Sequence, residues 1–85
     1  YPEELLNMSG YMNMDMQQPE KAKMYFEPAM EYYPKSANAN DSMAEYYEAQ
    51  GDFANAIKYV TKAFELSDND YYKKRIEGLK VKKNN

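Results

Sequence analysis

The sequence of 85 residues contains no cysteine and no histidine. A chain without these residues has no disulfide, no thiol redox pair, no Ser-His-Asp or Cys-His triad and none of the usual zinc sites. We therefore expect no catalytic activity in this chain, and no metal or cofactor. Because cysteine usage is the compositional sign of an oxidising or reducing compartment, its absence leaves the localisation open.

Glycine and proline are scarce, with 3 and 4 residues, and no apolar run approaches the roughly 18 residues that a membrane-spanning helix needs. The first ten residues, YPEELLNMSG, do not combine a basic segment with an apolar one, as a secretory signal does. We expect no membrane partner. The chain does not begin with Met, so we expect residues 1–85 to be one domain taken from a larger protein.

The usual core residues are few, since Leu, Ile, Val and Phe together number 11. Their place is taken by 10 Tyr, 7 Met and 9 Ala, so we expect a core of alanine, methionine and aromatic rings. The net charge of −3 does not indicate a nucleic-acid partner. Six of the 11 basic residues follow position 72, where a polar helix would close the end of a helical stack.

Apolar residues recur at the helical spacing i, i+3, i+4 and i+7 along the chain, and no strand pattern is present. Phe53, Ala56 and Val60 are part of the clearest example. The spacing predicts five helices, over residues 4–16, 19–33, 37–50, 53–66 and 69–81. Pro28 falls inside the second of them and removes one backbone hydrogen bond, so we expect a kink near Glu27 rather than the loss of the helix.

Short polar residues predict where the helices begin. The third helix begins either at Ser36 or with a capping box formed by Ser42 and Glu45. The last helix has two candidate N-caps, Asp68 and Asp70.

The sequence contains a weak internal repeat with a period of about 34 residues. Small residues recur at this spacing at Gly10, Ala44 and Gly78, where one helix would let another approach closely. Identical residues recur at the same spacing in four further pairs: Ala22 and Ala56, Tyr25 and Tyr59, Ala29 and Ala63, and Glu31 and Glu65. Such a period, built from paired helices, is the pattern of the tetratricopeptide repeat.

Residues 51–66, GDFANAIKYVTKAFEL, resemble the second half of a tetratricopeptide repeat (TPR), whose family pattern runs close to GDYxxAIxYYxKALEL. The matching residues are Gly51, Asp52, Ala56, Ile57, Tyr59, Lys62, Ala63, Glu65 and Leu66. The resemblance implies an all-α fold of antiparallel helix-turn-helix repeats, a TPR-like α-solenoid. It implies repeat one at 3–36, repeat two at 37–70 and a C-terminal capping helix at 71–82, all within one domain.

In such a fold the first helices of the repeats line a concave groove that binds a protein or a peptide. The positions that the family uses for ligands correspond to Asn7, Tyr11, Met14, Asn38, Asp41, Glu45, Glu48, Tyr72, Arg75 and Leu79. The middle of this groove would be acidic, through Asp41, Glu45 and Glu48, so the acidic C-terminal peptides that groove clamps of this family bind are disfavoured. From the residues alone, Glu45 and Glu48 are interpreted as members of a solvated helix face.

Residues 33–45, YPKSANANDSMAE, are similar to a YPxSxNxxDSLxE stretch that joins two repeats at the C-terminus of bacterial α/β-hydrolase esterases. This narrower resemblance implies a larger bacterial protein with a hydrolase domain upstream of Tyr1.

The leading hypothesis is therefore a non-catalytic module for protein–protein interaction, appended to the C-terminal side of a hydrolase. Its partner would be a protein, a peptide or the catalytic domain of the parent protein. The alternative is a structural spacer or a dimerisation tail without a peptide ligand. A homodimer would form through the first helix, where Leu5, Met8, Met12 and Met16 predict an apolar stripe.

Overall fold

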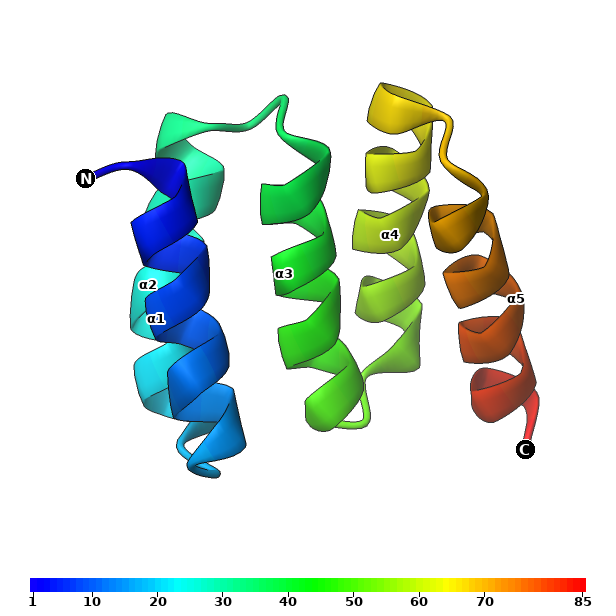
Figure 1. The fold of residues 1–85 in the computed structure, drawn as a ribbon. Coiled ribbons are helices and arrows are strands. Elements are labelled where there is room, and N and C mark those ends of the chain that lie inside the picture. The colour runs from blue at the N-terminus through cyan, green and yellow to red at the C-terminus, as the bar shows by residue number, and fades with distance from the viewer.

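A computed structural model describes residues 1–85 as five α-helices without any strand (Figure 1). The helices are α1 (Glu3–Asp15), α2 (Pro19–Tyr32), α3 (Ala37–Ala49), α4 (Phe53–Ser67) and α5 (Asp70–Asn84). All five predicted helices are confirmed, and their ends differ from the prediction by at most three residues. None of them is long and apolar enough to cross a bilayer.

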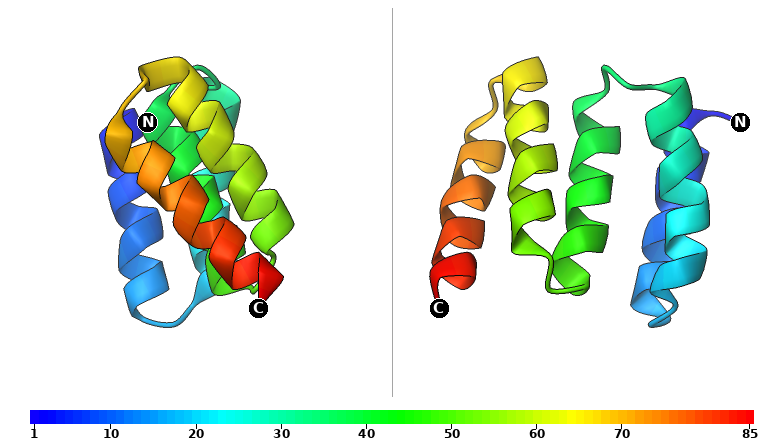
Figure 2. Two further views of the ribbon diagram at one scale, coloured as in Figure 1. Left: turned by 90° about the vertical axis from the view of Figure 1, so that its right-hand side faces the viewer. Right: turned by 180° about the vertical axis from the view of Figure 1, so that it is seen from behind.

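Each helix is antiparallel to the next, and the helices form a row in which α1 lies in front of α2 at one end and α5 lies at the other (Figures 1 and 2). The two helices of each repeat pack against each other, α1 on α2 and α3 on α4, while α5 packs on α4. Contacts of α3 with both α1 and α2 join the two pairs. The predicted all-α solenoid is confirmed.

Alanine brings the helices close enough to form a core. Six alanines have no exposed surface, and they lie at the contacts within and between the helix pairs: Ala22, Ala29, Ala39, Ala44, Ala56 and Ala63. Larger residues fill the space between them. Phe26 lies in the pair of α1 and α2, Val60 lies in the pair of α3 and α4, and Leu79 of α5 packs with residues of α4. Short side chains thus allow a chain with few large aliphatic residues to bury a continuous interior.

The helix N-termini are capped by side chains that are only partly those predicted. The Oγ atom of Ser36 accepts a hydrogen bond from the backbone N–H of Ala39 at 3.2 Å, so Ser36 begins α3. The alternative capping box of Ser42 and Glu45 is wrong, because both residues lie inside α3 and Ser42 is buried.

The start of α5 corrects a second prediction. Neither Asp68 nor Asp70 is its N-cap; Asn69 is, because its Oδ1 accepts a hydrogen bond from the backbone N–H of Tyr71 at 2.9 Å. Asp68 instead ends α4 in the left-handed conformation, with φ at 48°. Asp70 is in the first turn of α5, where a carboxylate still favours the positive end of the helix dipole.

The helix α2 continues through Pro28 from Pro19 to Tyr32, so the predicted survival of this helix is confirmed. The buried residues Phe26 and Ala29 flank the proline and pack against neighbouring helices on both sides of it. Tertiary packing therefore compensates the missing hydrogen bond. The kink near Glu27 stays a prediction.

Two glycines at equivalent repeat positions differ in what surrounds them. A Cβ atom on Gly10 would overlap the ring of the fully buried Phe26, whereas a Cβ on Gly78 would meet no atom within 4 Å. We expect Gly10→Ala to destabilise the fold by roughly 1–3 kcal/mol through overpacking. Gly78→Ala should stabilise it by up to about 1 kcal/mol, because alanine is the better helix former.

Urea unfolding followed by circular dichroism measures both changes, and each variant is the control for the other. Equal effects of the two substitutions would contradict the close approach of α1 and α2 at Gly10.

Candidate functional site

The side of the row formed by α1, α3 and α5 carries two hollows. One, of about 400 Å³, lies between α1 and α3 and is lined by Glu4, Asn7, Met8, Tyr11, Asn38, Asp41 and Ser42. The other, of about 290 Å³, lies between α3 and α5 and is lined by Glu48, Tyr71, Lys74, Arg75, Gly78, Leu79 and Lys82. Together they form a polar surface along the first helices of the repeats, which is the candidate site.

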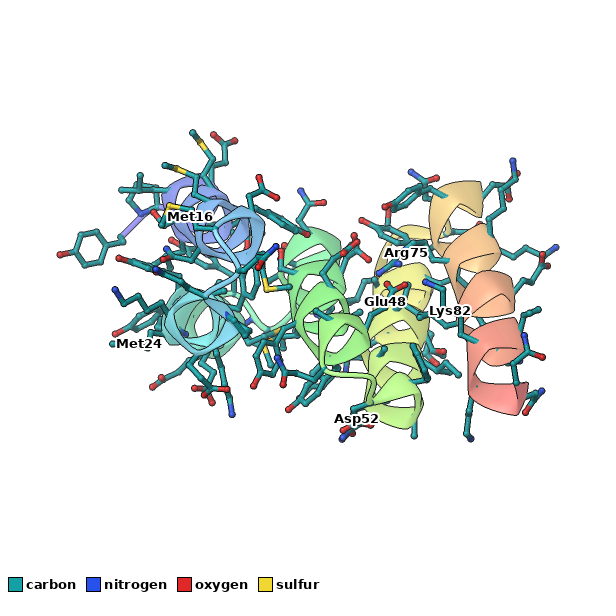
Figure 3. The ribbon with its side chains drawn as sticks, turned by 90° about the horizontal axis from the view of Figure 1, so that it is seen from below. Met16, Met24, Glu48, Asp52, Arg75 and Lys82 are labelled. Carbon is teal, nitrogen blue, oxygen red and sulfur yellow. The ribbon has the colours of Figure 1, made fainter.

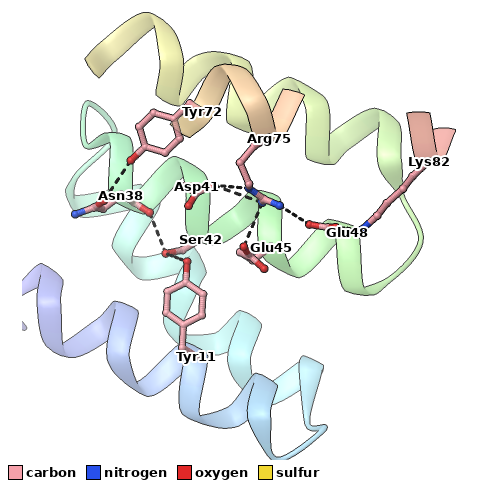
Figure 4. A network of polar contacts seen from close by, with 9 residues as sticks. All are labelled: Tyr11, Asn38, Asp41, Ser42, Glu45, Glu48, Tyr72, Arg75 and Lys82. Atoms are coloured by element: carbon pink, nitrogen blue, oxygen red, sulfur yellow. Dashed lines mark hydrogen bonds and ion pairs between the residues drawn. The ribbon is translucent and has the colours of Figure 1, made fainter. Parts of the chain in front are cut away.

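An arginine from α5 is bound by three carboxylates of α3 (Figures 3 and 4). The Nη1 atom of Arg75 donates to Glu48 Oε1 at 2.6 Å, and Nη2 lies 3.3 Å from Glu45 Oε1 and 3.5 Å from Asp41 Oδ1. A second oxygen of Glu48 accepts from Lys82. The side chain of Arg75 is only 15% exposed, so the cluster is a half-buried link between α3 and α5.

The three carboxylates respond differently to this environment. Burial raises the pKa values of Asp41 and Glu45, and the nearby charge of Arg75 only partly opposes it. Burial also acts to raise the pKa of Glu48, but hydrogen bonds from Arg75 and Lys82 outweigh it and lower the pKa. For Arg75, burial favours the neutral form, yet the hydrogen bond to Glu48 and the charges of the three acids raise its pKa further.

The interpretation of Glu45 and Glu48 as a solvated helix face is wrong. Their side chains are 34% and 18% exposed, and α5 supplies the cations that were not expected beside them. The acids of α3 are therefore paired within the chain. A sequence signal for this pairing exists, because Arg75 follows Asp41, and Lys82 follows Glu48, by one repeat length. Opposite charges one repeat apart occupy neighbouring first helices.

A second polar network surrounds the buried hydroxyl of Ser42 (Figure 4). Its Oγ lies 3.1 Å from Asn7 Oδ1, 3.2 Å from the hydroxyl of Tyr11 and 2.9 Å from the carbonyl oxygen of Asn38. The hydroxyl of Tyr72 donates to Asn38 Oδ1 at 3.3 Å. Burial raises the pKa of Tyr11 to about 12, and its hydroxyl accepts the hydrogen bond from Ser42 Oγ. The network holds α1, α3 and α5 in register.

Most of the predicted groove residues lie at these two hollows. Asn7, Tyr11, Asn38 and Asp41 line the first hollow, while Glu48, Arg75 and Leu79 line the second. Glu45 binds Arg75 beside them.

Three of the predicted residues are mainly structural. Leu79 is 1% exposed and belongs to the core of α4 and α5, and Tyr72 is also buried there. Met14 packs against the buried cluster around Phe26 and Met43 and does not line either hollow. Their helix positions are close to the groove, but the side chains fill the interior.

Several lining residues were not predicted: Glu4, Met8, Ser42, Tyr71, Lys74, Gly78 and Lys82. All of them except Lys74 precede or follow a predicted position by one turn, so helical spacing from those positions is the signal that indicates them. The described chain holds no group of three or more acidic side chains placed to bind one metal ion.

The comparison with family models gives one family. The model described as "Tetratricopeptide repeat" matches twice, at residues 3–36 and at residues 37–70. Curated proteins give no match to the chain.

The contrasting pKa shifts give a test of the Arg75 cluster. Because the pKa of Glu48 is lowered in the folded state, its charge stabilises the fold above its ordinary pKa of 4.5, and this is lost as the pH falls through the lowered value. We expect Glu48→Gln to cost roughly 1–3 kcal/mol at pH 7, the range for a hydrogen bond to a charged group. The cost should shrink on acidification.

Glu45→Gln is the matched control on the next turn of α3. The raised pKa of Glu45 means that its charge opposes folding above that value, and the penalty disappears below pH 4.5. This variant should be as stable as the wild type, or more stable, at pH 7. Urea unfolding between pH 3 and pH 7 measures both variants, and equal losses at pH 7 would contradict the assignment.

Proposed function

The chain belongs to the tetratricopeptide repeat family, and we propose that it is a non-catalytic module that binds an extended segment of a partner protein along α1, α3 and α5. Repeats of this family generally mediate binding between proteins. The observation that carries the proposal is the hollow of about 400 Å³ between α1 and α3. It is open to solvent and is lined by polar groups that have unused hydrogen-bonding capacity.

The amide groups of two asparagines supply this capacity. Asn38 is exposed, and only its oxygen atoms are bound within the chain, so its Nδ2 is free to donate. The Nδ2 of Asn7 has a single contact, with Glu3 at 3.5 Å. A carboxamide presents a donor and an acceptor side by side, which matches the main chain of an extended peptide. Main-chain recognition is therefore the chemistry proposed for this hollow.

The charges of the groove are mostly paired within the chain, and this pairing bears on the ligand that the groove prefers. The acids of α3 are paired with Arg75 and Lys82, so they do not present a free negative surface to a ligand. Of the other charged residues at the hollows, Glu4 and Lys74 have no ion pair within the chain. One unpaired acid thus lies at the first hollow and one unpaired base at the second. We propose an uncharged or mixed segment as ligand.

The hydrolase parent remains a proposal supported by the similarity of residues 33–45. In this segment Ser36 caps α3, and Asn40 donates to the carbonyl oxygens of Pro34 and Ser36. A G-x-S-x-G motif in the coding sequence upstream of Tyr1 would support a hydrolase parent, and a different upstream domain would contradict it. The alternative role is a spacer or dimerisation tail.

Selection of displayed random dodecapeptides against the wild-type chain tests the proposed groove. We expect the enriched peptides to bind Asn38→Ala about tenfold more weakly, because one lost hydrogen bond is worth roughly 1–1.5 kcal/mol. Fluorescence anisotropy with the labelled peptides measures this change.

Lys62→Ala on α4 is the control, since Lys62 is exposed and lies outside both hollows. Circular dichroism checks that both variants fold. No enrichment of peptides, or equal loss with both variants, would contradict binding in the groove and favour the spacer.

A further inference from the structure

The outer face of α1 at one end of the row is apolar and uncovered. Leu5, Met8, Met12 and Met16 are each between 49% and 62% exposed. The residues one repeat later show what such positions do when covered, since Ala39 and Tyr46, the equivalents of Leu5 and Met12, are buried in clusters with residues of α2. In Figure 3, Met16 lies at the end of the row that is farthest from α5. We call Leu5, Met8, Met12 and Met16 the α1 stripe.

A second uncovered face lies on α5 and continues from the hollow between α3 and α5. Tyr71, Lys74, Gly78 and Val81 follow the spacing of one helix face, and all four are exposed. We call these residues the α5 face. Three of them, without Val81, line the hollow of about 290 Å³.

Gly78 is the anomaly on the α5 face. Gly10 is required where Phe26 presses on α1, and Ala44 is buried against Ala56 and Val60, but nothing lies within 4 Å of a Cβ built on Gly78. A glycine inside an exposed helix costs about 1 kcal/mol relative to alanine. Within residues 1–85, no contact offsets the stability that this glycine costs the helix. A glycine at this position leaves room for the side chain of a neighbouring helix.

The two ends carry opposite charge. Residues 1–36 contain six acidic and three basic residues, while residues 73–85 contain six basic residues and one acid. On α1, Glu4 and Asp15 flank the stripe and have no ion pair within the chain, and about 16 Å of helix separates them. On α5, Lys74 belongs to the α5 face and is likewise unpaired.

We propose that the α1 stripe of one copy of this chain packs on the α5 face of a second copy. Methionine side chains adapt to the space above Gly78, and the acids beside the α1 stripe are attracted to Lys74 on the α5 face. Pairing of two α1 stripes would bring two net negative ends together, and pairing of two α5 faces would bring two net positive ends together. The contact is therefore head to tail, and it leaves one free face at each end of any assembly.

Two double variants test the proposal. Met8→Glu with Met12→Glu blocks the α1 stripe, and Lys74→Glu with Gly78→Gln blocks the α5 face. All four substitutions are at exposed positions, and circular dichroism checks that each variant folds. Sedimentation equilibrium over a concentration series measures the mass of each variant, of their equimolar mixture and of the wild type.

A head-to-tail contact has a specific signature in this experiment. Each variant alone should remain a monomer of 10.0 kDa, and the mixture should form a dimer of twice that mass that does not grow further, because each variant retains one intact face. The wild type should exceed the dimer as its concentration rises, and added salt should weaken the association.

Other outcomes overturn the proposal. A dimer formed by the α5-face variant alone would indicate pairing of two α1 stripes. A monomeric wild type and a monomeric mixture would exclude self-association through these faces. Because Met8 and three residues of the α5 face also line the hollows, peptide binding by the wild type and by Asn38→Ala is measured at protein concentrations where both are monomers. Its failure and the failure of self-association are then separate results.

Discussion

The close approach of neighbouring helices at small residues is the constraint on which this structure depends. Gly10 allows the ring of Phe26 to lie against α1, and Ala44 takes the same position in the second pair of helices. Where the helices are close, short side chains and a few large ones fill the interior at normal density. This explains how a chain with little leucine, isoleucine and valine has a core, and why we expect one added methyl group at Gly10 to lower its stability.

The Arg75 cluster determines how α5 joins the rest of the molecule. Removing charged groups from water is costly, and the cost is offset only because each charge has an opposite partner. The cluster fixes the position of α5 along α3 and neutralises the surface that a ligand would meet. The ion pairs that link α5 to α3 therefore also influence which ligand the groove prefers. Carboxylates that already bind Arg75 attract a basic ligand less strongly.

The surfaces of the molecule differ in the kind of contact that they favour. The hollow between α1 and α3 offers amide and hydroxyl groups, which suit hydrogen bonds to an extended main chain. The two ends of the row offer an apolar stripe and an open glycine, with opposite charges beside them, which suit packing of a whole helix. Because Met8 and Gly78 also line the hollows, the two kinds of contact share part of one surface.

The sequence by itself determined the five helices and the internal repeat. These follow from local spacing, because helical periodicity and repeat register are properties of neighbouring residues along the chain. The resemblance to the tetratricopeptide repeat implied the side of the row on which Asn7, Tyr11 and Asn38 lie. Only the tertiary structure decided which of these side chains meet. It placed Arg75 among the acids of α3 and buried Leu79, because charge pairing and burial depend on how residues from different helices approach one another.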